Sequence, residues 1–90
     1  MAHVRFTRHL RRYFPSLAEG EVSGASVAEV VSDLDRRWPG LAAYLVTEDG
    51  ALRKHVNIFV NGELVRDRAA LSDPVVETDE LDVIQALSGG

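Results

Sequence analysis

The sequence predicts an α+β domain in which one mixed β-sheet wraps around a single main helix. Two kinds of pattern predict this fold. One segment carries an apolar stripe at helical spacing, and several short segments on both sides of it alternate apolar and polar residues as strands do. One amphipathic helix needs one sheet to cover its apolar face, so both patterns belong to the same core. The 90 residues are enough for one domain and leave no room for a second.

The N-terminal part begins with a predicted strand at residues 3–7. Val4 and Phe6 point to one side of this strand, and the residues between them point to the other. Residues 10–17 contain a proline and are expected to form a loop. A weaker strand is predicted to follow at residues 19–23.

The helix is the clearest predicted element. Ser26 and Glu29 have the spacing of a capping box, in which the two side chains satisfy free amides at a helix start. An apolar stripe follows: Val27, Val30, Val31, Leu34 and Trp38. Charged residues fill the opposite face: Asp33, Asp35, Arg36 and Arg37. Pro39-Gly40 predicts the end of the helix. Trp38 is the last residue of the apolar stripe, so we expect it to be a core anchor.

The second half of the chain is predicted to be mostly β-structure. Residues 41–47 are apolar and are expected to end in a strand or a turn. Residues 56–60 alternate strongly, and the Asn61-Gly62 pair after them predicts a hairpin, because a type I′ turn needs two positive φ angles. Residues 81–86 form the last predicted strand. Together the elements predict a β-grasp arrangement, a mixed sheet wrapped around the helix.

Composition and charge exclude several classes of function. The chain contains no cysteine, which excludes disulfides, thiolate zinc sites and a cysteine nucleophile. Its formal net charge of -4 argues against a general nucleic-acid-binding protein. No segment resembles a signal peptide or a membrane span, so we expect a cytoplasmic protein that contacts no membrane.

Side chains with the chemistry of an active site show no functional pattern. His3, His9 and His55 lack the spacing of metal ligands, so we expect no metal site. The serines have no nucleophile motif, and nothing places an acidic pair in a cleft. We therefore predict no catalytic residue in this chain.

Acidic residues concentrate near the end of the sequence: Asp73, Glu77, Asp79, Glu80 and Asp82. One interpretation is a solvated face, which is the usual meaning of a charge run. The other is an acidic collar around the C-terminal tail that meets a basic surface on a partner. Both interpretations stay open at this point.

The last four residues, 87–90, form a predicted flexible tail after a domain that spans residues 1–86. Gly89-Gly90 leaves a carboxylate on a stem without side chains, which can enter a narrow active site where any Cβ would collide. The reactive group would then be the main-chain carboxylate of Gly90. A frayed end without a function is the ordinary alternative.

Three segments of the chain occur in a characteristic order: Val56-Asn57-Ile58-Phe59-Val60-Asn61-Gly62-Glu63, then Leu71-Ser72-Asp73-Pro74-Val75, then Asp79-Glu80-Leu81-Asp82-Val83 with the tail Ala86-Leu87-Ser88-Gly89-Gly90. In this order the chain resembles the MoaD/ThiS family of sulfur-carrier proteins, a branch of the ubiquitin-like β-grasp fold. The resemblance covers nearly the whole chain, and its specific part begins at Val56. The opening, Phe6-Thr7-Arg8-His9-Leu10, also looks like one subgroup of this family.

The resemblance implies a mechanism centred on Gly90. An E1-like adenylating enzyme would activate its carboxylate with ATP, and a sulfur donor would displace AMP to leave a C-terminal thiocarboxylate. A sulfur-accepting synthase would use that sulfur in the biosynthesis of molybdopterin, thiamine or a thiolated metabolite such as cysteine. Gly89 would allow a slender approach to the active site, and Ser88 and Leu87 would guide the tail. The carrier itself would bind no cofactor.

Phe59 and Ile84 are the predicted docking residues for the partner. They lie on the strand face opposite the residues predicted to pack on the helix: Val56, Ile58, Val60, Leu81 and Val83. An exposed apolar pair on the outer sheet face is typical of a docking surface. A loop or a second copy of the chain that covers the pair is the alternative.

Two other functions remain open. A ubiquitin-like modifier would be conjugated to lysines of other proteins through Gly90, so the same tail serves the carrier and the modifier. A non-catalytic binding module would make no use of the tail. The biosynthetic pathway, the sulfur donor and the oligomeric state also stay open.

Overall fold

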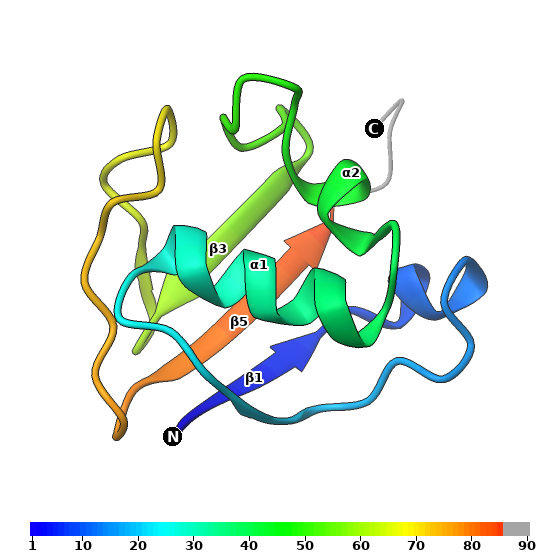
Figure 1. The fold of residues 1–90 in the computed structure, drawn as a ribbon, viewed down its shortest axis with the longest axis horizontal. Helices are drawn as coiled ribbons and strands as arrows, with labels where there is room; N and C mark the ends of the chain where they lie inside the picture. Colours follow the sequence, from blue (N-terminus) through cyan, green and yellow to red (C-terminus); the bar gives the residue numbers. More distant parts are fainter. Residues whose placement is uncertain (86–90) are drawn as a thin grey trace.

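The computed structural model describes residues 1–85 and contains one sheet with helices on one side (Figure 1). In chain order, its elements are: β1 (Ala2–Phe6), the 3-10 helix η1 (Arg8–Arg12), β2 (Gly20–Val22), α1 (Val27–Arg37), α2 (Leu41–Leu45), β3 (Val56–Val60), β4 (Glu63–Leu64) and β5 (Glu80–Gln85). Among the helices that the structure describes, none has the length and apolar character to cross a bilayer.

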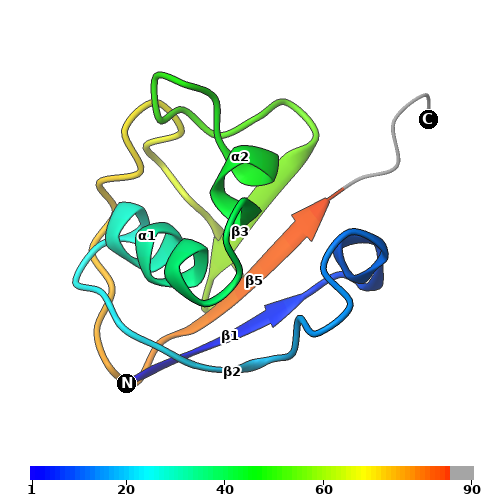
Figure 2. The same ribbon diagram turned by 45° about the vertical axis from the view of Figure 1, so that its right-hand side comes forward.

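The five strands form one mixed sheet in the order β2-β1-β5-β3-β4. The last strand, β5, lies at the centre, parallel to β1 and antiparallel to β3. Val83 pairs with Phe6 on one side and with Ile58 on the other, so the apolar positions of the three strands share a register. Figures 1 and 2 show α1 packed across one face of this sheet. The predicted mixed sheet around one main helix is confirmed.

The core lies between the inner face of the sheet and α1. Its largest fully buried side chains come from every part of the chain: Leu10, Leu34, Leu41, Leu45, Ile58, Leu71, Leu81, Val4, Val22, Val27, Val30 and Val56. Trp38, at the end of the helical stripe, packs against this core and meets Phe6 edge-on, with ring centroids 6.1 Å apart. Its Nε1 donates to Ser16 Oγ at 3.0 Å, which satisfies its one polar group.

The start of α1 has the predicted capping box. Ser26 Oγ accepts a hydrogen bond from the backbone N–H of Glu29 at 3.2 Å. In return, Glu29 Oε1 accepts from the backbone N–H of Ala25 at 3.0 Å. Both side chains that the sequence pattern had identified act at the helix start, although Glu29 bonds to Ala25, one residue before the N-cap Ser26.

The predicted hairpin turn is also present. Asn61 has φ 52° and Gly62 has φ 83°, the two positive angles that a type I′ turn needs. The Asn61 side chain has a second role, because its Nδ2 donates to Asp79 Oδ1 at 2.8 Å and its Oδ1 accepts from the backbone N–H of Glu80 at 2.9 Å. The turn is therefore fixed against the beginning of β5.

Two segments differ from their predicted structures. Residues 41–47 begin with the helix α2, which was not predicted, and then end as predicted, with Val46 in an isolated β-bridge to Leu52 and a turn from Thr47 to Gly50. The helical turn η1 occupies the first part of the expected loop at residues 10–17. The physical reason for α2 lies upstream of it. Oδ1 of Asp35 accepts the backbone N–H of Gly40 at 3.1 Å and that of Ala42 at 3.0 Å, which caps the new helix.

Asp33 also differs from its predicted position on the polar face of the helix. It is the one buried charged side chain among residues 1–85, with 7 % of its surface exposed. Its Oδ2 accepts the backbone N–H of Ser23 at 3.0 Å, and its carboxylate forms ion pairs with Arg36 and Arg37. The carboxylate joins the chain before α1 to the helix itself, which explains why it is turned inward.

Candidate functional site

The end of strand β5 is held on both sides. The backbone N–H of Gln85 donates to Thr7 Oγ1 at 3.2 Å, and the backbone N–H of Thr7 donates to the Val83 carbonyl at 3.1 Å. On the other side, Gln85 pairs with Val56 at the start of β3. The point from which residues 86–90 continue is therefore fixed by contacts with two neighbouring strands.

The predicted tail residues lie outside the described residues. This applies to Gly90, Gly89, Ser88 and Leu87, and to Ala86, the predicted last residue of the domain. Their predicted roles remain predictions, and the site geometry that follows concerns residues up to Gln85.

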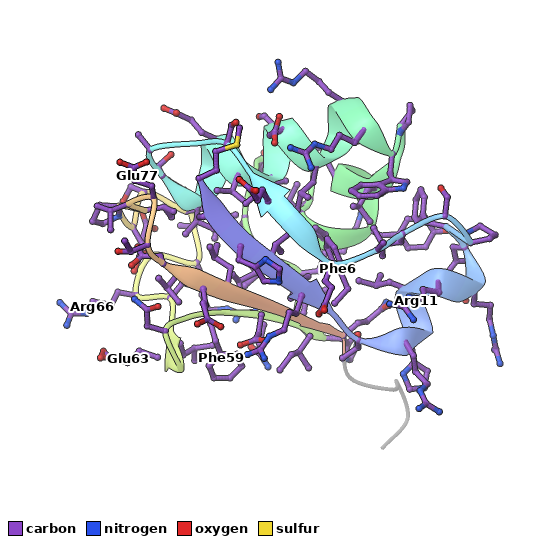
Figure 3. The ribbon with its side chains drawn as sticks, turned by 90° about the horizontal axis from the view of Figure 1, so that it is seen from below. Phe6, Arg11, Phe59, Glu63, Arg66 and Glu77 are labelled. Atoms are coloured by element: carbon purple, nitrogen blue, oxygen red, sulfur yellow. The ribbon has the colours of Figure 1, made fainter. Side chains whose placement is uncertain are left out.

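The outer face of the sheet, away from the helices, carries an apolar patch. Ile84 is 36 % exposed, and Phe59 is half-buried on the neighbouring strand. Leu64, directly opposite Phe59 in the β3–β4 hairpin, is 46 % exposed. Figure 3 shows Phe59 on the side of the sheet opposite the helices. We call Phe59, Leu64 and Ile84 the outer apolar patch.

Leu64 was missed by the sequence reasoning. The available signal was the hairpin itself, because the Asn61-Gly62 turn fixes which residues face each other across it. With Phe59 on the outer face, its cross-strand partner Leu64 must be there too.

An ion pair borders the outer apolar patch. Arg5 donates from Nε to Asp82 Oδ1 at 2.8 Å and from its terminal nitrogen to Oδ2 at 3.1 Å. Asp82 pairs with Phe59 across the strands, so the ion pair and the aromatic ring are neighbours. The hydrogen bond and the charge of Asp82 raise the pKa of Arg5, which stays charged.

Of the two interpretations of the acidic residues, the structure favours a solvated face over a collar. Strand β5 begins at Glu80 and ends at Gln85, so the acidic residues 73–79 precede the strand and lie away from its end at Gln85. Several of these carboxylates have structural partners instead. The two oxygens of Asp73 accept the backbone N–H groups of Arg66 and Asp67, each at 2.9 Å, and these bonds lower the pKa of Asp73.

The histidines do not form a site within the described part of the chain. His3 lies in β1, His9 in η1 and His55 just before β3. Among residues 1–85 no group of three or more histidine, aspartate or glutamate side chains is arranged to hold a metal ion.

A five-stranded mixed sheet with a central last strand, wrapped around one main helix, defines this chain as a ubiquitin-like β-grasp protein. The similarity to known proteins is more specific. The sequence model of the ThiS family matches residues 4–90, and the chain belongs to the ThiS family.

Curated relatives with similar sequences fall into two kinds. Over 70 residues, the chain is 33% identical to "Sulfur carrier protein CysO" of Mycobacterium tuberculosis, an alignment that covers 76% of this chain and 75% of the relative. Over 66 residues, the chain is 32% identical to "Small archaeal modifier protein 3" of Haloferax volcanii. This alignment covers 73% of this chain and 71% of that protein.

Solved structures repeat this division. The CysO of an Amycolatopsis orientalis BexX/CysO complex matches with a TM-score of 0.85 and 32% identity, over 100% of both chains. Mycobacterium tuberculosis CysO matches with a TM-score of 0.83 and 27% identity, over 97% of this chain and 100% of that one. SAMP1 from Haloferax volcanii matches with a TM-score of 0.74 and 28% identity, over 99% of this chain and 98% of that one.

Proposed function

We propose that this chain is a sulfur carrier whose working group is the carboxylate of Gly90. The single observation that carries the proposal is the ThiS family match, which runs from residue 4 through residue 90 and so includes the diglycine. The similarity to sulfur carrier protein CysO, at 33% identity, supports the same role.

The proposed chemistry takes place on the backbone terminus. A carboxylate is a poor electrophile, so an E1-like adenylating enzyme joins it to the α-phosphate of ATP, and pyrophosphate leaves. A sulfur nucleophile then attacks the carbonyl carbon of the acyl adenylate, and AMP leaves. The product is a thiocarboxylate, a soft nucleophile that a sulfur-accepting synthase can use.

In this proposal the chain is a protein co-substrate and contributes no catalytic group. The folded body presents the stem, and the contacts of Gln85 with Thr7 and Val56 support this role because they fix where the stem begins. ATP is bound and used by the partner, and we expect the reaction in the cytoplasm. The thiocarboxylate is the only modification that the carrier itself requires.

The outer apolar patch is the proposed docking surface for the adenylating enzyme. Exposed apolar side chains gathered on one sheet face are typical of interaction surfaces. Ile84 supports the proposal most directly, because it is exposed on the same strand that leads to Gly90. A partner that covers Ile84 also lies next to the beginning of the stem.

The test is incubation of the purified chain with an adenylating enzyme, ATP and a sulfide source, followed by intact-mass measurement. Replacement of one carboxylate oxygen by sulfur predicts a gain of about 16 Da. Deletion of Gly90 should abolish the gain, whereas the Gly20→Ala variant, altered in the body of the domain, should keep it. An unchanged mass in the presence of ATP would reject the carrier function and favour a binding module.

A protein modifier is the second candidate function. The observation that favours it is the 32% identity to small archaeal modifier protein 3, together with the similar fold of SAMP1. In that case the activated Gly90 carbonyl would form an isopeptide bond with a lysine of another protein. Ladders of conjugated proteins that disappear on deletion of Gly90 would distinguish this outcome from thiocarboxylate formation.

A further inference from the structure

Two separate segments that carry basic residues flank the end of β5. We call the set of these residues the basic rim, and its members are: Arg8, Arg11, Arg12, Arg53 and Lys54. All five are exposed. Three belong to η1, which follows β1, and two belong to the connection between α2 and β3.

Backbone contacts place both segments beside Gln85. Arg8 comes directly after Thr7, which is hydrogen-bonded to Gln85 and to Val83. The backbone N–H of Val56, which pairs with Gln85, donates to the carbonyl of Arg53 at 3.0 Å, so the turn that contains Lys54 adjoins the same strand end. Figures 1 and 2 show η1 on one side of the end of β5, and α2 with its following loop on the other.

Aromatic packing joins η1 to α2, and the backbone N–H of Arg53 donates to the Leu45 carbonyl of α2 at 3.0 Å. The rings of Tyr13 and Tyr44 are stacked with centroids 5.0 Å apart, which connects the residue after η1 to α2. Phe14 meets Tyr44 edge-on at 5.3 Å. These contacts hold the two segments in a fixed relation, so the basic rim is organised before any partner binds.

The charge of the basic rim is not neutralised by ion pairs within residues 1–85. The ion pairs there involve Met1, Arg5, Arg36 and Arg37 as the cations. Arg11 and Arg53 instead donate from Nε to the backbone carbonyls of Leu17 and Ala43, at 3.1 and 2.8 Å. These bonds position the guanidinium groups and leave their positive charge in place.

The charge of the basic rim is opposite in sign to the net charge of the whole chain. The chain as a whole has a net charge of -4, and two of its acidic residues, Glu48 and Asp49, precede Arg53 in the same loop. Figure 3 shows Arg11 at one end of the sheet, and Glu63 and Glu77 at the other. The molecule therefore has a basic end where residues 86–90 begin and an acidic end where β5 starts.

Residues 86–90, the stem, are so short that the basic rim must face the enzyme. Residues 86–90 are five residues, which span at most about 17 Å when fully extended. An enzyme that holds the Gly90 carboxylate in an active site must therefore approach Gln85 to within about that distance. The protein surface around the entrance to that active site then faces the basic rim.

We propose that the basic rim is an electrostatic docking surface for an acidic protein surface that borders the active-site entrance of the enzyme acting on Gly90. The inference rests on the proposed function. Complementary charge of this kind mainly raises the association rate and selects the correct partner. The outer apolar patch supplies apolar contact, and the basic rim orients the stem towards the entrance.

The test measures association of the full chain with the adenylating enzyme of the same organism by stopped-flow fluorescence. The double variant Arg8→Glu/Lys54→Glu should lower the association rate constant by about tenfold or more at low salt. Raising the salt concentration from about 50 to 500 mM should slow the wild-type chain much more than the double variant. The control is Arg66→Glu, which reverses one exposed charge at the acidic end, half the charge change of the double variant, and it should change the rate constant by less than about twofold.

The outcomes separate the inference from the function on which it rests. Equal effects of the double variant and the Arg66→Glu control, or no effect of either, would overturn the docking role of the basic rim while ATP-dependent thiocarboxylate formation continues. Binding of single-stranded RNA that the same double variant abolishes, with an unchanged rate towards the enzyme, would also overturn it. Absence of any ATP-dependent mass gain in the wild-type chain would remove the proposed function and the inference together. Unchanged circular dichroism and melting temperature establish that the double variant is folded.

Discussion

The backbone N–H of Gln85 donates to Oγ1 of Thr7 at 3.2 Å, a contact between residues 78 positions apart in the sequence. The hydroxyl extends the pairing of β1 and β5 by one more bond beyond the strand that ends at Phe6. As a result, the last described residue is hydrogen-bonded to Thr7, beside β1, and lies opposite Val56 of β3 in the sheet register. The end of β5 is therefore held by a side chain near the N-terminus.

We predict that Thr7→Val frees the end of β5. The substitution keeps the shape and removes the acceptor of the Gln85 N–H, which should lower the free energy of unfolding by about 1 kcal/mol. Thr7→Ser keeps the hydroxyl and serves as the control. Urea denaturation measures the stability, and amide hydrogen exchange at Gln85 measures the local effect. Equal exchange rates in the Val and Ser variants would show that the hydroxyl does not hold the strand end.

We predict that alanine is tolerated at Gly20 and not at Gly24. Gly24 has φ 148°, and an added Cβ would meet the backbone nitrogen of Val30 at 2.7 Å, so Gly24→Ala should cost about 2 kcal/mol or more. A Cβ at Gly20 would meet nothing within 4 Å, so Gly20→Ala should stay within about 0.5 kcal/mol of wild type. Thermal denaturation of the two variants compares the same chemical change at two sites. Similar melting temperatures would contradict the close approach of Gly24 to α1.

We predict that the buried carboxylate of Asp33 makes stability fall in acid. The backbone N–H of Ser23 lowers the pKa of Asp33 below its ordinary value of 3.8, helped by Arg36 and Arg37 and opposed by burial. Because the folded state holds this proton less tightly than the unfolded state, its stabilisation is complete above the ordinary pKa. It is lost as the pH falls through the lower, folded pKa.

The measurement for Asp33 is the free energy of unfolding of the wild type and of Asp33→Asn between pH 7 and pH 2. At pH 7 the variant should be less stable by about 1–2 kcal/mol, because it keeps an acceptor and loses the charge. The difference should shrink towards the acid end of the range, where the wild-type carboxyl is protonated as well. A difference that stays constant with pH would contradict the assigned shift. Comparing the two proteins cancels the contributions of Asp67 and Asp73, whose pKa values are also lowered.

We predict that Ile84→Ala weakens binding to the adenylating enzyme and that Val76→Ala does not. Both residues are exposed and apolar, at 36 % and 59 %, but Val76 lies in the segment before β5 and outside the outer apolar patch. Loss of an interface anchor predicts roughly a tenfold higher Kd for Ile84→Ala. Isothermal titration calorimetry provides the comparison. If both variants bind as tightly as the wild type, the docking surface lies elsewhere.

The elements that the sequence predicts correctly are those with a local cause. Ser26 and Glu29 are three residues apart and cap α1 directly. Asn61 and Gly62 adopt the two positive φ angles themselves. Neither signal requires knowledge of any distant part of the chain, so each can be identified from a short stretch of sequence.

The elements that the sequence does not predict have causes farther away. Helix α2 begins after a proline and a glycine, and its first amides are capped by Asp35 from the preceding helix. Five residues are also too few for a helical repeat to be recognised. Asp33 looks like a surface residue by its helical position, and its burial depends on Ser23, ten residues before it.

In the candidate site, too, features with a local cause are predicted from the sequence and features that depend on distant contacts are not. The alternation in β3 and β5 identifies Phe59 and Ile84 as residues of one face, and the structure places both there. The interpretation of the acidic residues as a collar relied on closeness in sequence, and in the structure most of them lie before β5 and away from Gln85. The residues that do border Gln85 come from the beginning and the middle of the chain, and only the topology of the sheet brings them together.

The central position of β5 also determines when this protein can fold during its synthesis. Until the ribosome has polymerised the stretch up to Gln85, the β1–β2 and β3–β4 pairs have no strand to join them, and the nascent chain has two open hairpins in place of one sheet. Assembly must therefore wait for the last-made strand. A prematurely terminated product without β5 lacks both a stable fold and an end that can be activated. An adenylating partner that requires the folded surface would therefore not consume ATP on such a product.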